Sequence, residues 1–219
     1  MNTPVIEVKD LVKRYDGGPA ILDGVSFSVD EGEFVTIYGK SGCGKTTLLN
    51  IIGGLDRPTS GTVRIDGRDI VGLSENELAR LRLENVGFVF QDFNLLLDMT
   101  VLENIALPQR LAGVRDTGKV EALLERFGMK HIAMESARRI SGGEAQRTAV
   151  ARAVVNEPRV ILADEPTGNL DSENTEKVIA MFHSIREELS TTIVLATHNE
   201  GLARHSTKVV NLGECRRFQ

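Results

Sequence analysis

The sequence predicts an α/β fold built on a mainly parallel sheet with helices on both faces. Short runs of β-branched and aromatic residues alternate with segments of helical periodicity, which is the pattern of such a sheet. The composition is that of an ordinary globular protein, with 41% hydrophobic and 26% charged residues. The length of 219 residues suits one sizeable domain, or a core with an insertion.

The residue pattern of the N-terminal half predicts several strands separated by turns. These strands are Val5–Val8, Val25–Val29, Phe34–Tyr38, Thr62–Asp66 and Val86–Phe90. An apolar helical pattern over Thr47–Ile52 follows the third strand and ends at Gly53-Gly54, a suitable helix stop. Strands return near the C-terminus, around a helix predicted over Ser172–Leu189. They are Val160–Ala163, Thr192–Ala196 and Lys208–Leu212.

Helical periodicity begins before the last of the N-terminal strands and dominates from about Phe93 to Ala153. Helical periodicity extends over Ser74–Leu83, Val101–Leu111, Lys119–Phe127 and Gly143–Val155. We therefore predict a single domain over residues 1–219. Its core is formed by residues 1–91 and 158–219, and residues 92–157 form a helical insertion.

Charge and targeting signals narrow the classes of function. A net charge of −5 and a pI near 5.5 argue against a broad surface for nucleic acid or lipid headgroups. No run approaches the roughly 18 consecutive apolar residues of a membrane helix, and the N-terminus lacks a secretory signal. We therefore expect a cytoplasmic protein.

The two cysteines, Cys43 and Cys215, are too few for a metal cluster or a disulfide framework. We expect Cys43 to fill space, with a redox-sensitive thiol as the alternative. His131, His183 and His205 have no motif around them and are expected at the surface.

The first motif matches G-x-x-x-x-G-K-[ST] and lies between a predicted strand and a predicted helix. Its residues are Gly39-Lys40-Ser41-Gly42-Cys43-Gly44-Lys45-Thr46. The glycines let backbone N–H groups point at phosphate oxygens, and the helix dipole adds to the attraction. Lys45 is expected to reach the β- and γ-phosphates, and Thr46 to ligate Mg²⁺. Thr47 completes the candidate nucleotide-binding set.

The second motif is an apolar strand that ends in two carboxylates, Asp164 and Glu165. Ligands of α/β folds bind at the carboxyl ends of such strands. We expect Asp164 to hold the Mg²⁺ shell and Glu165 to accept a proton from an attacking water. Together the two motifs predict a P-loop NTPase, a class that includes kinases, GTPases and recombinase-type ATPases.

A third motif separates these classes. It is Ile140-Ser141-Gly142-Gly143-Glu144, an N-capped helix start that offers a second anion site. With it the chain resembles the ABC ATPases, whose signature is usually Leu-Ser-Gly-Gly-Gln. The resemblance implies that Ser141, Gly142, Gly143 and Glu144 contact ATP held by a second copy, so that the chain works as a homodimer. Glu144 in place of Gln is expected to cost affinity unless it points away.

The resemblance extends to further residues and to the fold. Gln91 resembles the Q-loop glutamine that contacts Mg²⁺ and the water, and His198 resembles the switch histidine that bonds the γ-phosphate. Tyr15 resembles the aromatic residue that stacks on adenine, and Asn169–Asp171 resembles the D-loop at the dimer seam. The family also implies ATP and Mg²⁺ as cofactors, together with an N-terminal antiparallel β subdomain.

Within the ABC ATPases the chain looks most like the lipoprotein-release, macrolide-export and antimicrobial-peptide detoxification group. The segments that carry this likeness are 47–56, 86–96 and 162–172. The group implies an ATPase subunit on the cytoplasmic face of the inner membrane, where it powers an integral membrane permease. Two alternatives are a soluble ABC ATPase acting on ribosomes or DNA, which usually has two cassettes, and a P-loop kinase. The kinase leaves the third motif and His198 unexplained.

Overall fold

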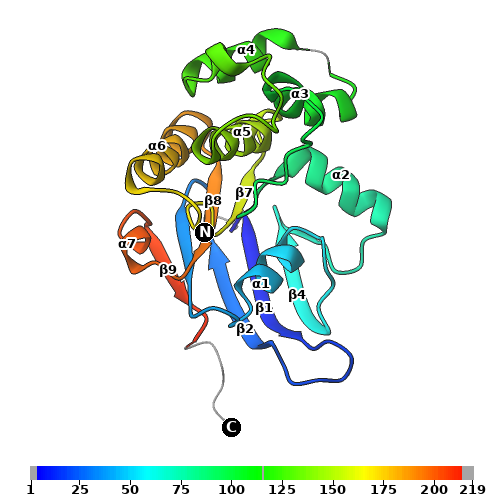
Figure 1. The fold of residues 1–219 in the computed structure, drawn as a ribbon. Helices are drawn as coiled ribbons and strands as arrows, with labels where there is room; N and C mark the ends of the chain where they lie inside the picture. The colour runs from blue at the N-terminus through cyan, green and yellow to red at the C-terminus, as the bar shows by residue number, and fades with distance from the viewer. Residues whose placement is uncertain (1–3, 115, 214–219) are drawn as a thin grey trace.

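The computed structural model describes residues 4–114 and 116–213 (Figure 1). Its centre is a five-stranded sheet with the order β6-β7-β8-β3-β9, in which all paired strands are parallel. The strands are β3 (Phe34–Tyr38), β6 (Val86–Val89), β7 (Val160–Asp164), β8 (Thr192–Thr197) and β9 (Lys208–Asn211). The predicted α/β class with a parallel-sheet core is confirmed.

A second sheet is antiparallel and has the order β2-β1-β4-β5. Its strands are β1 (Ile6–Lys13), β2 (Leu22–Val29), β4 (Ser60–Ile65) and β5 (Arg68–Asp69). The antiparallel N-terminal part is therefore also confirmed. Neither the short β5 nor the full length of β1 was predicted. In β1 a register shift between Lys9 and Val12 interrupts the alternation of apolar residues, and β5 has only two residues, both exposed.

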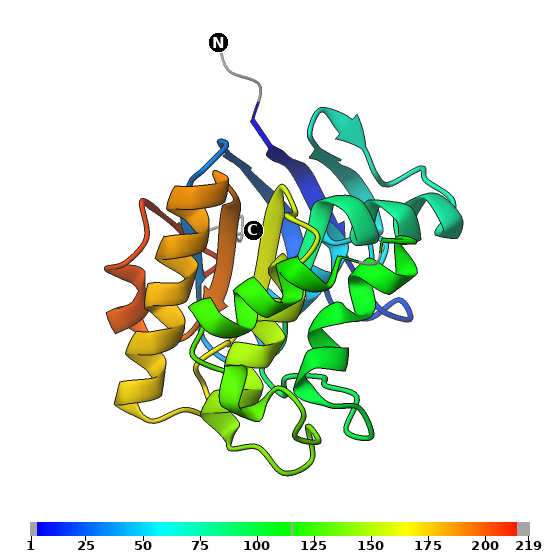
Figure 2. The ribbon, with the colours of Figure 1, turned by 90° about the horizontal axis from the view of Figure 1, so that it is seen from above.

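Helices cover both faces of the parallel sheet (Figures 1 and 2). On one side α1 (Lys45–Ile52) contacts strands of both sheets. On the other side lie α3 (Val101–Leu111), α4 (Thr117–Arg126), the 3₁₀ turn η1 (Lys130–Ile132), α5 (Gly142–Val154) and α6 (Ser172–Leu189). The remaining helices are α2 (Glu75–Asn85) and the short α7 (Glu200–Ala203). Residues 92–157 thus supply mainly helices, and their status as a separate subdomain stays a prediction.

Alternate residues of each parallel strand enter two different hydrophobic cores. In β7, Leu162 packs in the core shared with α1 and the antiparallel sheet, whereas Ile161 and Ala163 pack in the core shared with α5 and α6. Every residue of β8 is buried for the same reason. Burial on both faces explains why these strands read as continuous apolar runs.

The fold places the chemistry-bearing segments at one edge. The phosphate loop follows β3, Asp164 ends β7, His198 follows β8, and Gln91 comes soon after β6. Because the carboxyl ends of parallel strands lie at the same edge of a sheet, these segments meet there.

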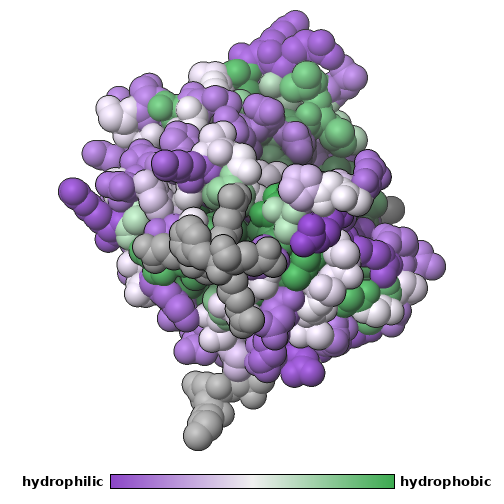
Figure 3. Space-filling view, turned by 90° about the horizontal axis from the view of Figure 1, so that it is seen from below, coloured by the Kyte–Doolittle hydropathy of each residue, from purple (hydrophilic) through white to green (hydrophobic). Residues whose placement is uncertain are grey.

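No helix within residues 4–114 and 116–213 is long and apolar enough to cross a membrane. The face seen in Figure 3 has hydrophilic side chains over most of its rim and hydrophobic ones in smaller groups.

Candidate active site

The phosphate loop turns sharply from β3 into α1. Gly44 caps the helix at φ 101°, a left-handed conformation that favours glycine. A Cβ at this position would come within 2.8 Å of Leu22 and 3.1 Å of the Ile21 carbonyl oxygen. No side chain caps this helix start, so its first N–H groups face the pocket as an anion site.

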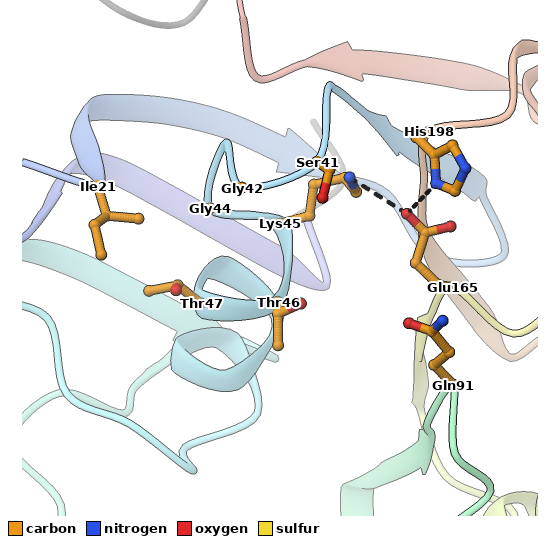
Figure 4. Close-up of a pocket in the computed structure, with 10 residues that line it drawn as sticks. All are labelled: Ile21, Ser41, Gly42, Gly44, Lys45, Thr46, Thr47, Gln91, Glu165 and His198. Carbon is orange, nitrogen blue, oxygen red and sulfur yellow. Dashed lines mark hydrogen bonds and ion pairs between the residues drawn. The ribbon is translucent and has the colours of Figure 1, made fainter. Parts of the chain in front are cut away.

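The Lys45 side chain is almost fully buried and points back across the loop. Its Nζ donates to the carbonyl oxygens of Gly39 (2.9 Å) and Lys40 (3.3 Å). The same ammonium lies 3.3 Å from Oε1 of Glu165 (Figure 4). The loop and the end of β7 are therefore connected through one charged group.

Glu165 is held from several directions. Its Oε1 lies 2.9 Å from Nδ1 of His198, and its Oε2 accepts from the Thr197 hydroxyl at 3.1 Å. Its backbone is left-handed, with φ 44°, a conformation that costs about 1–3 kcal/mol in a non-glycine residue. The Glu165 N–H donates to Ala196 O at 2.9 Å, which fastens this residue to β8.

Asp164 and Thr46 offer a fit for a magnesium ion. Oδ1 of Asp164 is buried and has no hydrogen-bond partner in the described part of the chain. Burial raises the pKa of Asp164, and a hydrogen bond with Thr46 opposes the shift. A carboxylate and a hydroxyl side by side suit Mg²⁺, which takes few protein ligands and completes its shell with water and phosphate oxygens. The described residues contain no cluster of three His, Cys, Asp or Glu side chains placed to hold a metal.

Lys45, Thr46, Glu165 and His198 line one pocket of about 530 Å³, and Asp164 lies directly before Glu165 in the chain. Its walls are Ile21, Ser41, Gly42, Gly44, Lys45, Thr46, Thr47, Gln91, Glu165 and His198 (Figure 4). Gln91 is exposed, and its amide reaches towards Gly168 from the side opposite the loop. The structure thus brings together all the residues assigned a catalytic role in the sequence.

The residues Ser141, Gly142, Gly143 and Glu144 lie outside this pocket. Ser141 caps α5 in a capping box: its hydroxyl accepts from the Glu144 N–H, while Oε2 of Glu144 accepts from the Ser141 N–H (2.8 Å) and hydroxyl (2.6 Å). The hydrogen bonds from the Ser141 side chain and backbone lower the pKa of Glu144. Glu144 is therefore folded back on its own helix start.

Tyr15 lies beside the pocket and does not line it. Its hydroxyl donates to Oδ2 of Asp56 at 2.6 Å, and the residue is 45% exposed. Burial raises the pKa of Tyr15, Asp56 adds to the shift, and a hydrogen bond with Thr47 opposes it. Because Thr47 lines the pocket, the Tyr15 hydroxyl is within reach of its rim.

Some residues of this region carry no sequence signal. Ile21 lines the pocket from the turn before β2, and Thr197 holds Glu165, yet neither belongs to a motif. Arg152 of α5 donates to the carbonyl oxygens of Phe93 (2.8 Å) and Asn94 (2.6 Å), just after Gln91. Only the fold places these side chains near the motifs.

Cys43 and the three histidines outside the motifs differ in how far they are buried. Cys43 is free and buried, and its sulfur occupies the space beside Gly39, as expected of a space-filling residue. Cys215 lies outside the described residues. His131 and His205 are exposed, and His183 is half-buried, with its ring against that of Phe34 and the two centroids 5.2 Å apart. Burial lowers the pKa of His183.

A glycine-rich loop opening a helix, next to a strand that ends in two carboxylates, defines a P-loop nucleotide-binding protein. Comparison with protein families makes this specific, because the ABC transporter family model matches residues 22–168. The chain belongs to the ABC transporter family, and it is an ATPase of that family that uses ATP and Mg²⁺.

Two relatives belong to the group that the sequence resembles. The chain is 41% identical to the lipoprotein-releasing system ATP-binding protein LolD of Saccharophagus degradans, over 97% of this chain and 96% of that protein. It is 45% identical to the macrolide export ATP-binding/permease protein MacB of Syntrophobacter fumaroxidans, over 95% of this chain. The match spans only 30% of MacB.

Solved structures agree with these relatives. A dimeric, post-hydrolysis state of the ATP-binding cassette MJ0796, bound to ADP and Pi, has a TM-score of 0.87 and 38% identity. The match covers 94% of this chain and 93% of that one. The predicted family, fold and ATPase activity are therefore confirmed.

Proposed function

We propose that this chain hydrolyses ATP as a homodimer and thereby powers an integral membrane permease of the export, lipoprotein-release or peptide-resistance type. The observation that carries the proposal is the position of Glu165. Its carboxylate lies in the pocket beside the phosphate loop, oriented by His198 and Thr197 and within 3.3 Å of Lys45. A carboxylate fixed in this way is suited to accept a proton from water that attacks the terminal phosphate.

Each remaining residue receives a role from its place in the pocket or beside it. The residues Gly39, Lys40, Ser41, Gly42, Cys43, Gly44, Lys45, Thr46 and Thr47 cradle the phosphates. Thr46, Asp164 and Gln91 hold Mg²⁺, which when bound neutralises charge that develops on the phosphate oxygens. His198 orients Glu165 and donates a hydrogen bond to the terminal phosphate, while Tyr15 stacks on the base. The buried, unpartnered Oδ1 of Asp164 supports the metal assignment.

A second copy completes the site in this proposal. The start of α5 is exposed at Ser141 and Gly142, and it lies outside the pocket of its own chain. Helix starts attract anions through their free N–H groups. We therefore assign Ser141, Gly142, Gly143 and Glu144 to the ATP held by the partner. The dimeric MJ0796 cassette supports this arrangement.

A groove between α2, α3 and α5 is the proposed docking place for the permease. It has a volume of about 390 Å³ and lies next to the Gln91 loop. Phe88, Phe90, Pro108 and the 69%-exposed Leu111 contribute apolar surface. An exposed apolar groove of this kind suits a helix from a partner protein. Docking there places the chain at the cytoplasmic face of the inner membrane.

The test uses Glu165→Gln, which keeps the shape of the side chain and removes the base. With Mg-ATP the variant is expected to accumulate as a dimer in light scattering, whereas the wild type returns to monomer as it hydrolyses ATP. Glu84→Gln, on the exposed face of α2, is the matched control and behaves as wild type. A Glu165→Gln protein that binds ATP normally and stays monomeric at saturation contradicts the proposal.

A further inference from the structure

The Tyr15 ring is fastened by two charged residues that have no role in the function proposed above. Its hydroxyl donates to Oδ2 of Asp56 at 2.6 Å, while Nζ of Lys13 donates to Oδ1 of the same carboxylate at 2.7 Å. The Lys13 ammonium also lies over the ring, 4.4 Å from its centroid. One face of the aromatic ring is therefore covered by a cation, which leaves the opposite face for stacking.

The two charges are held firmly. Lys13 is only 8% exposed, and its Nζ makes a further hydrogen bond to the carbonyl oxygen of Arg57 at 2.6 Å. Burial acts to raise the pKa of Asp56, but hydrogen bonds from Lys13 and Tyr15 outweigh it and leave the pKa lowered. A charge-assisted network with each donor paired is more rigid than a neutral contact at the surface.

The network also fixes Tyr15 relative to the phosphate loop. Asp56 follows α1, the helix that begins in that loop, and its N–H donates to Asn50 O of the helix at 3.2 Å. The next turn is bonded back to β1, since Thr59 N–H donates to Val12 O at 2.8 Å. The aromatic ring and the phosphate site are thus parts of one connected unit.

We propose that Asp56 and Lys13 are positioning residues that hold the Tyr15 ring at a set distance from the phosphate loop, so that its free face receives the nucleotide base. This inference rests on the base-stacking role proposed for Tyr15. Binding of the base is strengthened because the aromatic platform is ordered before the ligand arrives. The phosphate chain of the nucleotide does not contact the ring, so its own binding is not strengthened.

Two probes separate these contributions: Mg-ATP and magnesium tripolyphosphate, which has the phosphates and no base. Tyr15→Phe and Asp56→Ala are each expected to raise the Kd for Mg-ATP about three- to tenfold, the scale of the net contribution of one ordinary hydrogen bond. The Kd for tripolyphosphate is expected to stay within about twofold of the wild type. Because both variants break the bond between Tyr15 and Asp56, the double variant should lose less than the sum of the two single losses.

The matched control is Glu75→Ala. Glu75, the first residue of α2, accepts from Arg57 at 3.0 Å, and Arg57 directly follows Asp56 in the chain. It should leave both Kd values unchanged. Equal weakening of ATP and tripolyphosphate by Tyr15→Phe overturns the inference, since that is the result of general loosening. Tyr15→Phe retains every contact of Lys13 with Asp56, so it remains informative if Asp56→Ala folds poorly.

Tyr15→Ala distinguishes failure of the inference from failure of the stacking role itself. If this variant weakens ATP about tenfold or more while Tyr15→Phe and Asp56→Ala bind normally, Tyr15 stacks on the base without help from Asp56. If Tyr15→Ala binds ATP as the wild type does, the stacking role fails and the positioning role fails with it.

Discussion

Nδ1 of His198 lies 2.9 Å from Oε1 of Glu165, so the loop after β8 holds the carboxylate that directly follows β7. Glu165 is mostly buried, with a side chain 13% exposed, whereas that of His198 is 63% exposed. The histidine therefore approaches from the open side of the pocket, where a terminal phosphate also has access.

Removing this contact is expected to slow chemistry more than binding. His198→Ala should lower kcat for ATP hydrolysis about 100-fold, the scale of a lost catalytic hydrogen-bonding group. The Kd for ATP should change less than about threefold, because phosphate binding depends mainly on the loop. Phosphate release and nucleotide titration measure the two quantities. His205→Ala, exposed and outside the pocket, is the control. An unchanged kcat in His198→Ala would remove this residue from the mechanism.

Glu144 places a negative charge at the start of α5, where the partner's phosphate is proposed to bind. Its capping-box geometry can be kept by glutamine, so Glu144→Gln removes charge without removing the cap. In a Glu165→Gln background we expect ATP-dependent dimerisation to tighten about two- to fivefold. Glu77→Gln, which changes the same capping position in α2, should have no effect. Weaker or equal dimerisation in analytical ultracentrifugation would mean that the charge at Glu144 does not oppose the phosphate.

A substitution at Gly142 is expected to impair dimer formation without impairing folding. A Cβ added here meets only the Phe93 ring, at 3.9 Å, so Gly142→Ala should fold with a Tm within about 2 °C of the wild type. The added methyl group lies on the exposed helix start and should block the approach of the partner's ATP. Dimerisation and ATPase rate should fall about tenfold or more. Normal ATPase activity in this variant would show that the α5 start does not approach nucleotide.

Asp164 predicts a pH-dependent effect on stability. Burial raises its pKa above the unfolded value. Its contribution to stability is therefore fully present at pH below the unfolded pKa and is lost as pH rises through the folded pKa. Without nucleotide, Asp164→Asn should raise the Tm at pH 7 and lose this advantage at about pH 4. With Mg-ATP the order reverses, because the variant loses a metal ligand. A thermal shift series with and without Mg-ATP checks both directions.

Arg152 joins α5 to the loop that carries Gln91. Its two hydrogen bonds hold Phe93 and Asn94, which are both left-handed, at φ 61° and 47°. Arg152→Ala should lower the free energy of unfolding by about 2 kcal/mol and reduce kcat, since Gln91 is displaced. Arg80→Ala, which removes an exposed pair with Glu84, should cost less than about 0.5 kcal/mol. Urea unfolding provides the comparison, and equal losses would refute the role given to Arg152.

The motifs themselves could be read from the sequence because each one is a local backbone requirement. The turn at Gly44 needs a left-handed backbone conformation, which favours glycine, and the pattern of glycines before Lys45 and Thr46 predicts such a turn. Gln91, Asp164 and His198 lie at ends of strands whose apolar runs are visible in the chain. The parallel sheet, its helical cover and the antiparallel N-terminal sheet therefore agree with the sequence.

What the tertiary structure alone decided are the contacts between segments far apart in the chain. The bonds from Tyr15 to Asp56, from Arg152 to Phe93 and from Thr197 to Glu165 join residues that no motif pairs. Strand register and helix packing set these distances, and neither leaves a local pattern of residue types. The sequence determined which groups perform the chemistry, and packing determined which side chains hold those groups in place.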